Sequence, residues 1–133
     1  MDLSTKVILA QSVLAAHLVV IAFNLFGLVA VPLGAWRGWA FVRRRGWRLL
    51  HLVSMAAVAL QALAGRACFL TIWQDQLTGV RGEPPLVMRW VNALIFWPLP
   101  LWAFAAAYAS ALAYACVLWV LVAPSRRPSS GRR

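Results

Sequence analysis

The chain has 133 residues and a formal net charge of +10, and 63% of its residues are hydrophobic while only 12% are charged. A soluble domain carries about a quarter charged residues and could not bury so much apolar surface, so we expect most of the chain to lie in a lipid bilayer. The positive charge does not indicate nucleic-acid binding, because the arginines stand between apolar runs and form no soluble basic module.

The first predicted span is the apolar run from Val7 to Val31, which should end at Pro32–Leu33–Gly34, a helix breaker followed by a cap glycine. A basic segment rich in tryptophan follows. Tryptophan and arginine together are typical of a membrane–water boundary. The residues concerned are Trp36, Arg37, Trp39, Arg43, Arg44, Arg45, Trp47 and Arg48.

The second predicted span runs from about Leu49 to about Ile72, and a polar loop from Gln74 to Pro85 follows it. The apolar stretch from Leu86 to Ala123 is interrupted by Trp97–Pro98–Leu99–Pro100. As one helix it would measure about 57 Å, well beyond a hydrocarbon core of about 30 Å. We therefore expect it to divide at the prolines.

The part before the prolines, Leu86 to Trp97, is short and contains Arg89 and Asn92, whereas Leu101 to Ala123 is long enough to cross. With three spans, the two arginine clusters share one side of the membrane; with four spans, they fall on opposite sides. The positive-inside rule favours three, with the N-terminus outside and the C-terminus in the cytoplasm. The expected fold is an all-α membrane bundle of three transmembrane helices plus one short interfacial or re-entrant helix, and four transmembrane helices are the alternative.

We expect a single membrane-embedded domain over residues 1–123 and a disordered basic tail over residues 124–133. The predicted location is a bacterial inner membrane, and the predicted partners are the bilayer itself and a larger membrane complex or a second copy of the chain.

Polar side chains within the spans follow helical spacing. His17, Asn24 and Gly27 are separated by steps of seven and three, and a second series on the next span has steps of three and four. Such spacing places polar and small residues on one stripe, which should face other helices. The second series is His51, Ser54, Val58, Gln61, Gly65 and Cys68.

If the first two spans form an antiparallel hairpin with a rise of 1.5 Å per residue, His17 lies at the same depth in the membrane as Gln61, and Asn24 at the same depth as Ser54. We therefore expect these residues to pair. The same count separates His17 from His51 by about 16 Å along the axis, too far for both to ligate one b-type haem. A site with a single histidine, or a second ligand supplied by another copy, stays open.

No catalytic constellation stands out, because the three acidic residues lie outside the spans and no nucleophile has a partnered base. Cys68 lies beside Arg66, which could activate it, but it also suits close helix packing. Tyr108 lies on the alanine-rich stripe of the last span and could add a hydroxyl to the polar interior.

Several of these residues resemble the domain of unknown function 2784 family. The resemblance is carried by a first-span histidine followed by Phe23, Asn24 and Gly27, by His51–Leu52, by Gly65 to Thr71, and by Ile95 to Trp102 followed by Tyr108. It covers roughly Leu9 to Leu121.

The resemblance implies a bacterial inner-membrane protein but no activity. It suggests a connected group of residues, namely His17, Asn24, His51, Gly65, Cys68 and Thr71. The family's usual proline after the cysteine and its glutamate six residues beyond are replaced here by Phe69 and Gln74.

Two functions follow as hypotheses. The first is a structural or accessory membrane subunit whose polar stripe packs the helices. The second is a protein that binds a cofactor, with haem b as one option, or a small ligand within the membrane, using His17, Asn24, Ser54 and Gln61.

Overall fold

The computed structural model describes residues 2–79, 86–95 and 98–125, and over these residues the fold is helical with no strand. Three helices are long and apolar enough to cross a membrane: α1 (Leu3–Arg37), α2 (Arg45–Leu63) and α5 (Leu101–Leu121). A short 3-10 helix, η1 (Ala40–Arg43), joins α1 to α2, and two short helices, α3 (Phe69–Thr78) and α4 (Leu86–Ile95), lie between α2 and α5. The predicted all-α class with three candidate spans is therefore confirmed.

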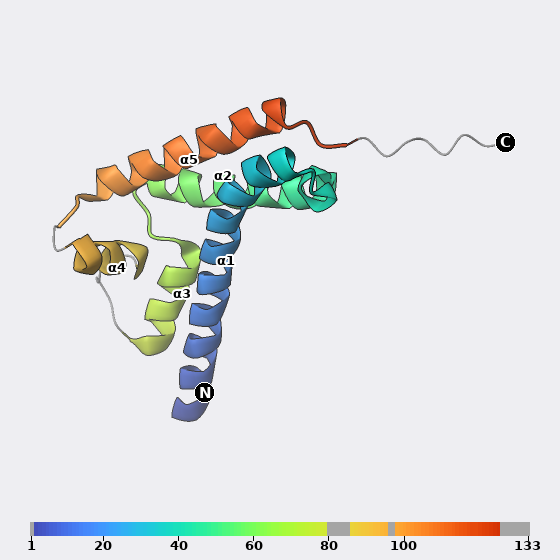
Figure 1. The fold of residues 1–133 in the computed structure, drawn as a ribbon. Helices are drawn as coiled ribbons and strands as arrows, with labels where there is room; N and C mark the ends of the chain where they lie inside the picture. The colour runs from blue at the N-terminus through green and yellow to red at the C-terminus, as the bar shows by residue number, and fades with distance from the viewer. Residues whose placement is uncertain (1, 80–85, 96–97, 126–133) are drawn as a thin grey trace.

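The helices are not arranged as one parallel bundle (Figure 1). α2 and α5 lie side by side and run in opposite directions, while α1 crosses this pair steeply and α3 packs along α1. α4 lies near the start of α5. Because α1 and α2 cross rather than run alongside each other, they meet over a short stretch of each helix.

α1 continues past the expected stop at Pro32 to Arg37 and is capped by Gly38, whose φ of 75° is left-handed and whose N–H donates to the carbonyl of Gly34. A proline within a helix removes one backbone hydrogen bond, and here the flanking turns persist. Gly34 is needed for packing instead, because a Cβ there would press on Val42 and Trp39 of the following segment. The predicted end of the first span at Pro32–Gly34 is thus wrong.

The second apolar run does not stay helical to Ile72, because α2 ends at Leu63 and the chain turns through Gly65, whose φ is 67°. Gln61 closes this turn: its Oε1 accepts from the Phe69 N–H at 2.7 Å and its Nε2 donates to the Ala57 carbonyl at 3.2 Å. The predicted continuous stripe therefore breaks after Gln61.

The polar stretch predicted as a loop from Gln74 begins inside α3, which extends to Thr78. The short fourth helix is confirmed as α4. Asn92 fixes the chain behind it, because its Oδ1 accepts from the Leu99 N–H at 3.0 Å. Residues 80–85 and most of the basic tail, 126–133, lie outside the described residues.

Arg48 joins the start of α2 to the end of α5. Its side chain is buried and donates to the carbonyls of Leu118 (2.7 Å) and Val122 (3.0 Å), with its guanidinium 5.6 Å from the Trp119 ring centroid. A cation near the carbonyls at a helix C-terminus is favourable. Nearby, the Ser125 N–H donates to the Arg43 carbonyl at 2.9 Å, so the segments that follow α1 and α5 lie together.

Candidate functional site

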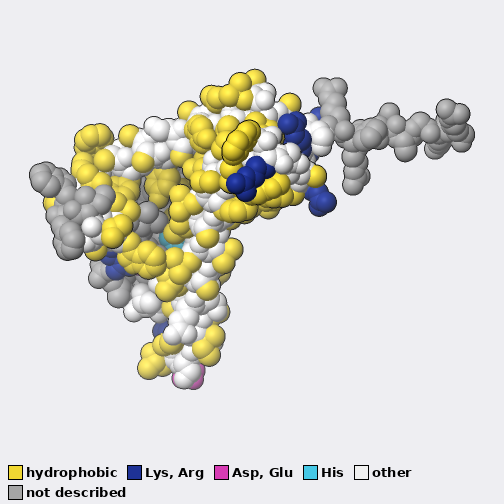
Figure 2. Space-filling view, viewed as in Figure 1, with side chains coloured by type: hydrophobic (Ala, Val, Ile, Leu, Met, Phe, Trp, Pro, Cys, Tyr) yellow, Lys and Arg dark blue, Asp and Glu magenta, His cyan; other side chains and the backbone are white. Residues whose placement is uncertain are grey.

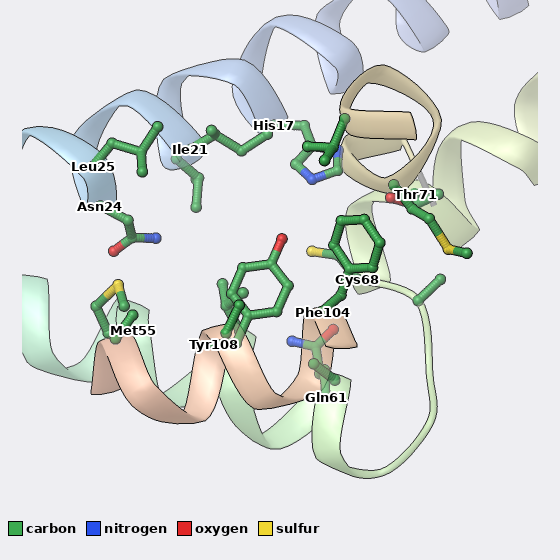
Figure 3. A pocket seen from close by; sticks show the side chains of 18 of the residues that line it. His17, Ile21, Asn24, Leu25, Met55, Gln61, Cys68, Thr71, Phe104 and Tyr108 are labelled. Carbon is green, nitrogen blue, oxygen red and sulfur yellow. The ribbon is translucent and has the colours of Figure 1, made fainter. Parts of the chain in front are cut away.

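A cavity of about 370 Å³ lies where all five α-helices approach one another (Figure 3). Its walls are almost entirely apolar, and the space-filling view shows the molecule hollowed on the side where α4 approaches α5 and α1 (Figure 2). Pockets of about 300–1,000 Å³ with apolar walls and a few convergent polar groups are typical small-molecule sites.

The polar groups of the lining come from separate segments of the chain. His17 and Asn24 are seven residues apart and so occupy the same face of α1. Thr71 faces the same space from α3, because α3 packs along α1, and Tyr108 enters from α5 with its hydroxyl directed toward α1 (Figure 3).

Three of these side chains are buried with a polar atom unsatisfied. His17, Asn24 and Thr71 are 5%, 8% and 3% exposed, and within the described part of the chain no partner bonds His17 Nδ1, Asn24 Oδ1 or Thr71 Oγ1. Leaving a buried polar atom unpaired costs about 1–3 kcal/mol, so proteins rarely do so without a reason. Three such atoms on the wall of one cavity mark it as a candidate binding site.

His51 has a different environment and does not line the cavity. Its Nε2 lies 3.0 Å from the backbone oxygen of Asn24, and since a carbonyl only accepts, Nε2 carries the proton and donates. The imidazole stacks on Trp47 (5.8 Å between centroids, 8° between planes) and meets Phe23 edge to face at 5.7 Å. Gly27 makes room for the ring, because a Cβ there would overlap it. His51 thus holds α1 against α2.

The predicted pairs along an antiparallel hairpin are wrong. Gln61 bonds the backbone of Phe69 and Ala57 rather than His17, although His17 and Gln61 both line the cavity, from opposite sides (Figure 3). Ser54 is half-buried, lies outside the lining and does not bond Asn24. The steep crossing of α1 over α2 explains this, because equal depth no longer brings residues of the two helices together.

Of the remaining candidates, Cys68 and Tyr108 line the cavity and are half-buried, and Arg66 is an exposed residue of the lining. Gly65 lies outside the lining. The spacing of polar residues gave no sign of Phe104 and Met55, because apolar residues in a span look alike whether they face lipid or a cavity.

Among the described residues no group of three or more histidines, cysteines and acidic residues is placed to hold a metal ion. The two histidines also do not form an axial pair for haem, because the Nε2 of His51 is bonded to Asn24 and its ring lies outside the cavity. The residues present fit an organic ligand held by hydrogen bonds and apolar contact.

Comparison with curated proteins and with solved structures gave no match. The family model described as "Protein of Unknown function (DUF2784)" matches residues 7–124, a range that includes every residue of the cavity lining. The chain therefore belongs to the DUF2784 family.

Proposed function

We propose that this protein is an integral membrane protein that binds a small lipophilic molecule in the cavity between its helices. The observation that carries the proposal is the set of three buried, unsatisfied polar atoms on His17, Asn24 and Thr71, which face one apolar space among the described residues. A ligand that bonded them would recover the cost of burying them.

The competing interpretation, in which the polar residues only pack the helices, accounts for His51 and Gln61, whose ring nitrogen and amide are bonded to backbone. It does not account for the other three. A side chain selected only to join helices would have its hydrogen bonds completed by the neighbouring helix.

The test is to fill the cavity with a larger side chain and to measure whether the purified protein still retains a bound small molecule. Ala111 lines the cavity on α5, and Ala113 is an exposed residue of the same helix outside the lining. Native mass spectrometry of the gently purified chain should show a bound small molecule in the wild type and in Ala113→Phe, and its loss in Ala111→Phe. No bound molecule in any variant, or equal retention by both, would contradict the proposal.

We also propose that the protein lies in a bacterial inner membrane with three spans, the N-terminus outside and the C-terminus in the cytoplasm. The arginine clusters that follow α1 and α5 in the sequence support this orientation. The hydrogen bond from the Ser125 N–H to the Arg43 carbonyl supports it too, because it holds the chain just after α5 next to the basic segment after α1. A C-terminal reporter should be active only in the cytoplasm; activity outside would refute this topology.

A further inference from the structure

The lining of the cavity narrows the chemistry of its occupant. We propose that the ligand is an uncharged, lipid-soluble molecule built on a six-membered ring with oxygen atoms at opposite positions, which is the chemistry shared by quinones and hydroquinones. This inference rests on the proposed function, and the experiment below separates the failure of one from the failure of the other.

The lining argues for an uncharged ligand. Among the described residues of the lining there is no aspartate or glutamate, and the one formally charged side chain is the exposed Arg66. The three unsatisfied atoms belong to an imidazole, an amide and a hydroxyl. A charged ligand buried among them would lack a counter-charge, which is costly in an apolar surrounding.

Two aromatic residues argue for a planar ring. Phe104 and Tyr108 stand four residues apart on α5, so they share one face of the helix, and both rings border the cavity (Figure 3). Aromatic faces favour another planar ring by offset or edge contacts. Met55 and Met88 also line the cavity, with flexible thioethers that adapt to a ring edge.

The spacing of polar groups argues for two oxygens. His17 and Asn24 are seven residues apart on one face of α1, so their Cα atoms are separated by about 10.5 Å along its axis. For side chains that extend at right angles to that axis, a hydrogen bond at each end takes up about 2.8 Å, which leaves about 5 Å between the two ligand atoms. Oxygens at opposite positions of a six-membered ring have this separation, whereas a single hydroxyl or carbonyl reaches one end only.

The protein groups can serve either redox form. Thr71 and Tyr108 carry hydroxyls that both donate and accept, and the Asn24 amide offers a donor beside its unsatisfied oxygen. A quinone carbonyl would accept hydrogen bonds from these donors, whereas a hydroquinone O–H could also donate a hydrogen bond to Asn24 Oδ1. His17 and Thr71 stand at one end of the cavity and Asn24 at the other, with Tyr108 between them (Figure 3).

The experiment uses the full chain in nanodiscs and five probes that each contain a ten-carbon chain. The first two are a fully substituted decyl-1,4-benzoquinone and its hydroquinone. The controls are 4-decylphenol, decylbenzene and decanoate. Affinity is measured from the concentration dependence of the thermal unfolding midpoint. We expect the quinone or the hydroquinone to bind at least about tenfold more tightly than decylbenzene, and the two arms tell which redox form is preferred.

Conservative variants test the contacts without disturbing the packing. Thr71→Val and Tyr108→Phe each remove one hydroxyl and should weaken binding of the preferred probe at least about fivefold, because one hydrogen bond to it is lost, while binding of decylbenzene stays unchanged. Thr78→Val is the matched control, because Thr78 is exposed on α3 and bonds its own helix.

Several results would overturn the inference. They are equal binding of decylbenzene, equal binding of 4-decylphenol, tightest binding of decanoate, or binding of no probe. If decylbenzene binds as tightly as the quinone and Ala111→Phe abolishes that binding, the proposed function still holds. Only the inference that the ligand is a ring with two oxygens is then refuted. Where no probe binds, the retention experiment decides separately whether the cavity has an occupant.

Discussion

Gly27→Ala tests the contact that sets the crossing of α1 and α2. A Cβ at Gly27 would overlap the Cδ2, Nε2 and Cε1 atoms of His51. The imidazole cannot move aside freely, since Nε2 is bonded to the Asn24 carbonyl and the ring is stacked on Trp47.

The expected cost follows from these contacts. Forcing a methyl group into a packed site costs about 1–3 kcal/mol, and displacing the ring would weaken a hydrogen bond worth about 1 kcal/mol. Alanine recovers up to about 1 kcal/mol of helix propensity over glycine. The substitution should therefore destabilise the protein by about 1–3 kcal/mol. Gly46→Ala lies in the first turn of α2, where an added Cβ would meet nothing within 4 Å, and should be neutral or mildly stabilising.

Equilibrium unfolding in detergent micelles measures both substitutions, and a double-mutant cycle isolates the contact. In a His51→Ala background the overlap is gone, so Gly27→Ala should lose its cost. The reasoning is refuted if Gly27→Ala is as stable as Gly46→Ala, or if its cost is the same with and without the imidazole.

Two further predictions concern α5 and the cavity wall. Arg48→Met removes two charge-assisted hydrogen bonds to the end of α5 and should lower the free energy of unfolding by about 2–4 kcal/mol. Arg45→Met, at an exposed position, should change it by less than about 0.5 kcal/mol. Similar values for the two variants would contradict the capping of α5 by Arg48. Ala111→Phe should slow alkylation of Cys68 by N-ethylmaleimide several-fold and leave the alkylation of Cys116 unchanged. The reason is that Cys68 lines the cavity, whereas Cys116 is exposed outside it. Equal effects on the two thiols would show that the cavity does not control access of the reagent to Cys68.

The three long helices could be predicted because each rests on an apolar run long enough to cross a bilayer. Their ends could not. Whether Pro32 stops a helix depends on packing around it, and the break after Leu63 depends on the left-handed Gly65 and on Gln61 bonding the Phe69 N–H. Steps of three and four continue through such a turn, so spacing alone does not detect it.

Helical spacing did place His17 and Asn24 on one face of α1, because positions seven apart share a face whatever the helix packs against. The residues that contact His17 and Asn24 could not be predicted without the angle between the helices. Counting depth assumes that α1 and α2 run alongside each other, and the steep crossing brings His51 to Asn24 in place of Ser54. Thr71 was predicted from the resemblance to the family and not from helical spacing, since α3 reaches α1 only through the turn at Gly65.

The free-energy cost of the unsatisfied buried groups gives a final prediction. Removing one such group should change the stability of the ligand-free and the ligand-bound protein in opposite directions. Thr71→Val keeps the shape of the side chain and removes a buried hydroxyl that bonds no partner among the described residues. Without ligand, the variant should be more stable than the wild type by about 1–3 kcal/mol, the penalty of an unsatisfied buried hydroxyl. Thr78→Val makes the same change on the same helix at an exposed hydroxyl that donates to the Gln74 carbonyl, and should not stabilise. If the hydroxyl of Thr71 instead served the fold, its removal would destabilise the ligand-free protein. Unfolding of the delipidated chain therefore separates a residue kept for a ligand from one kept for packing.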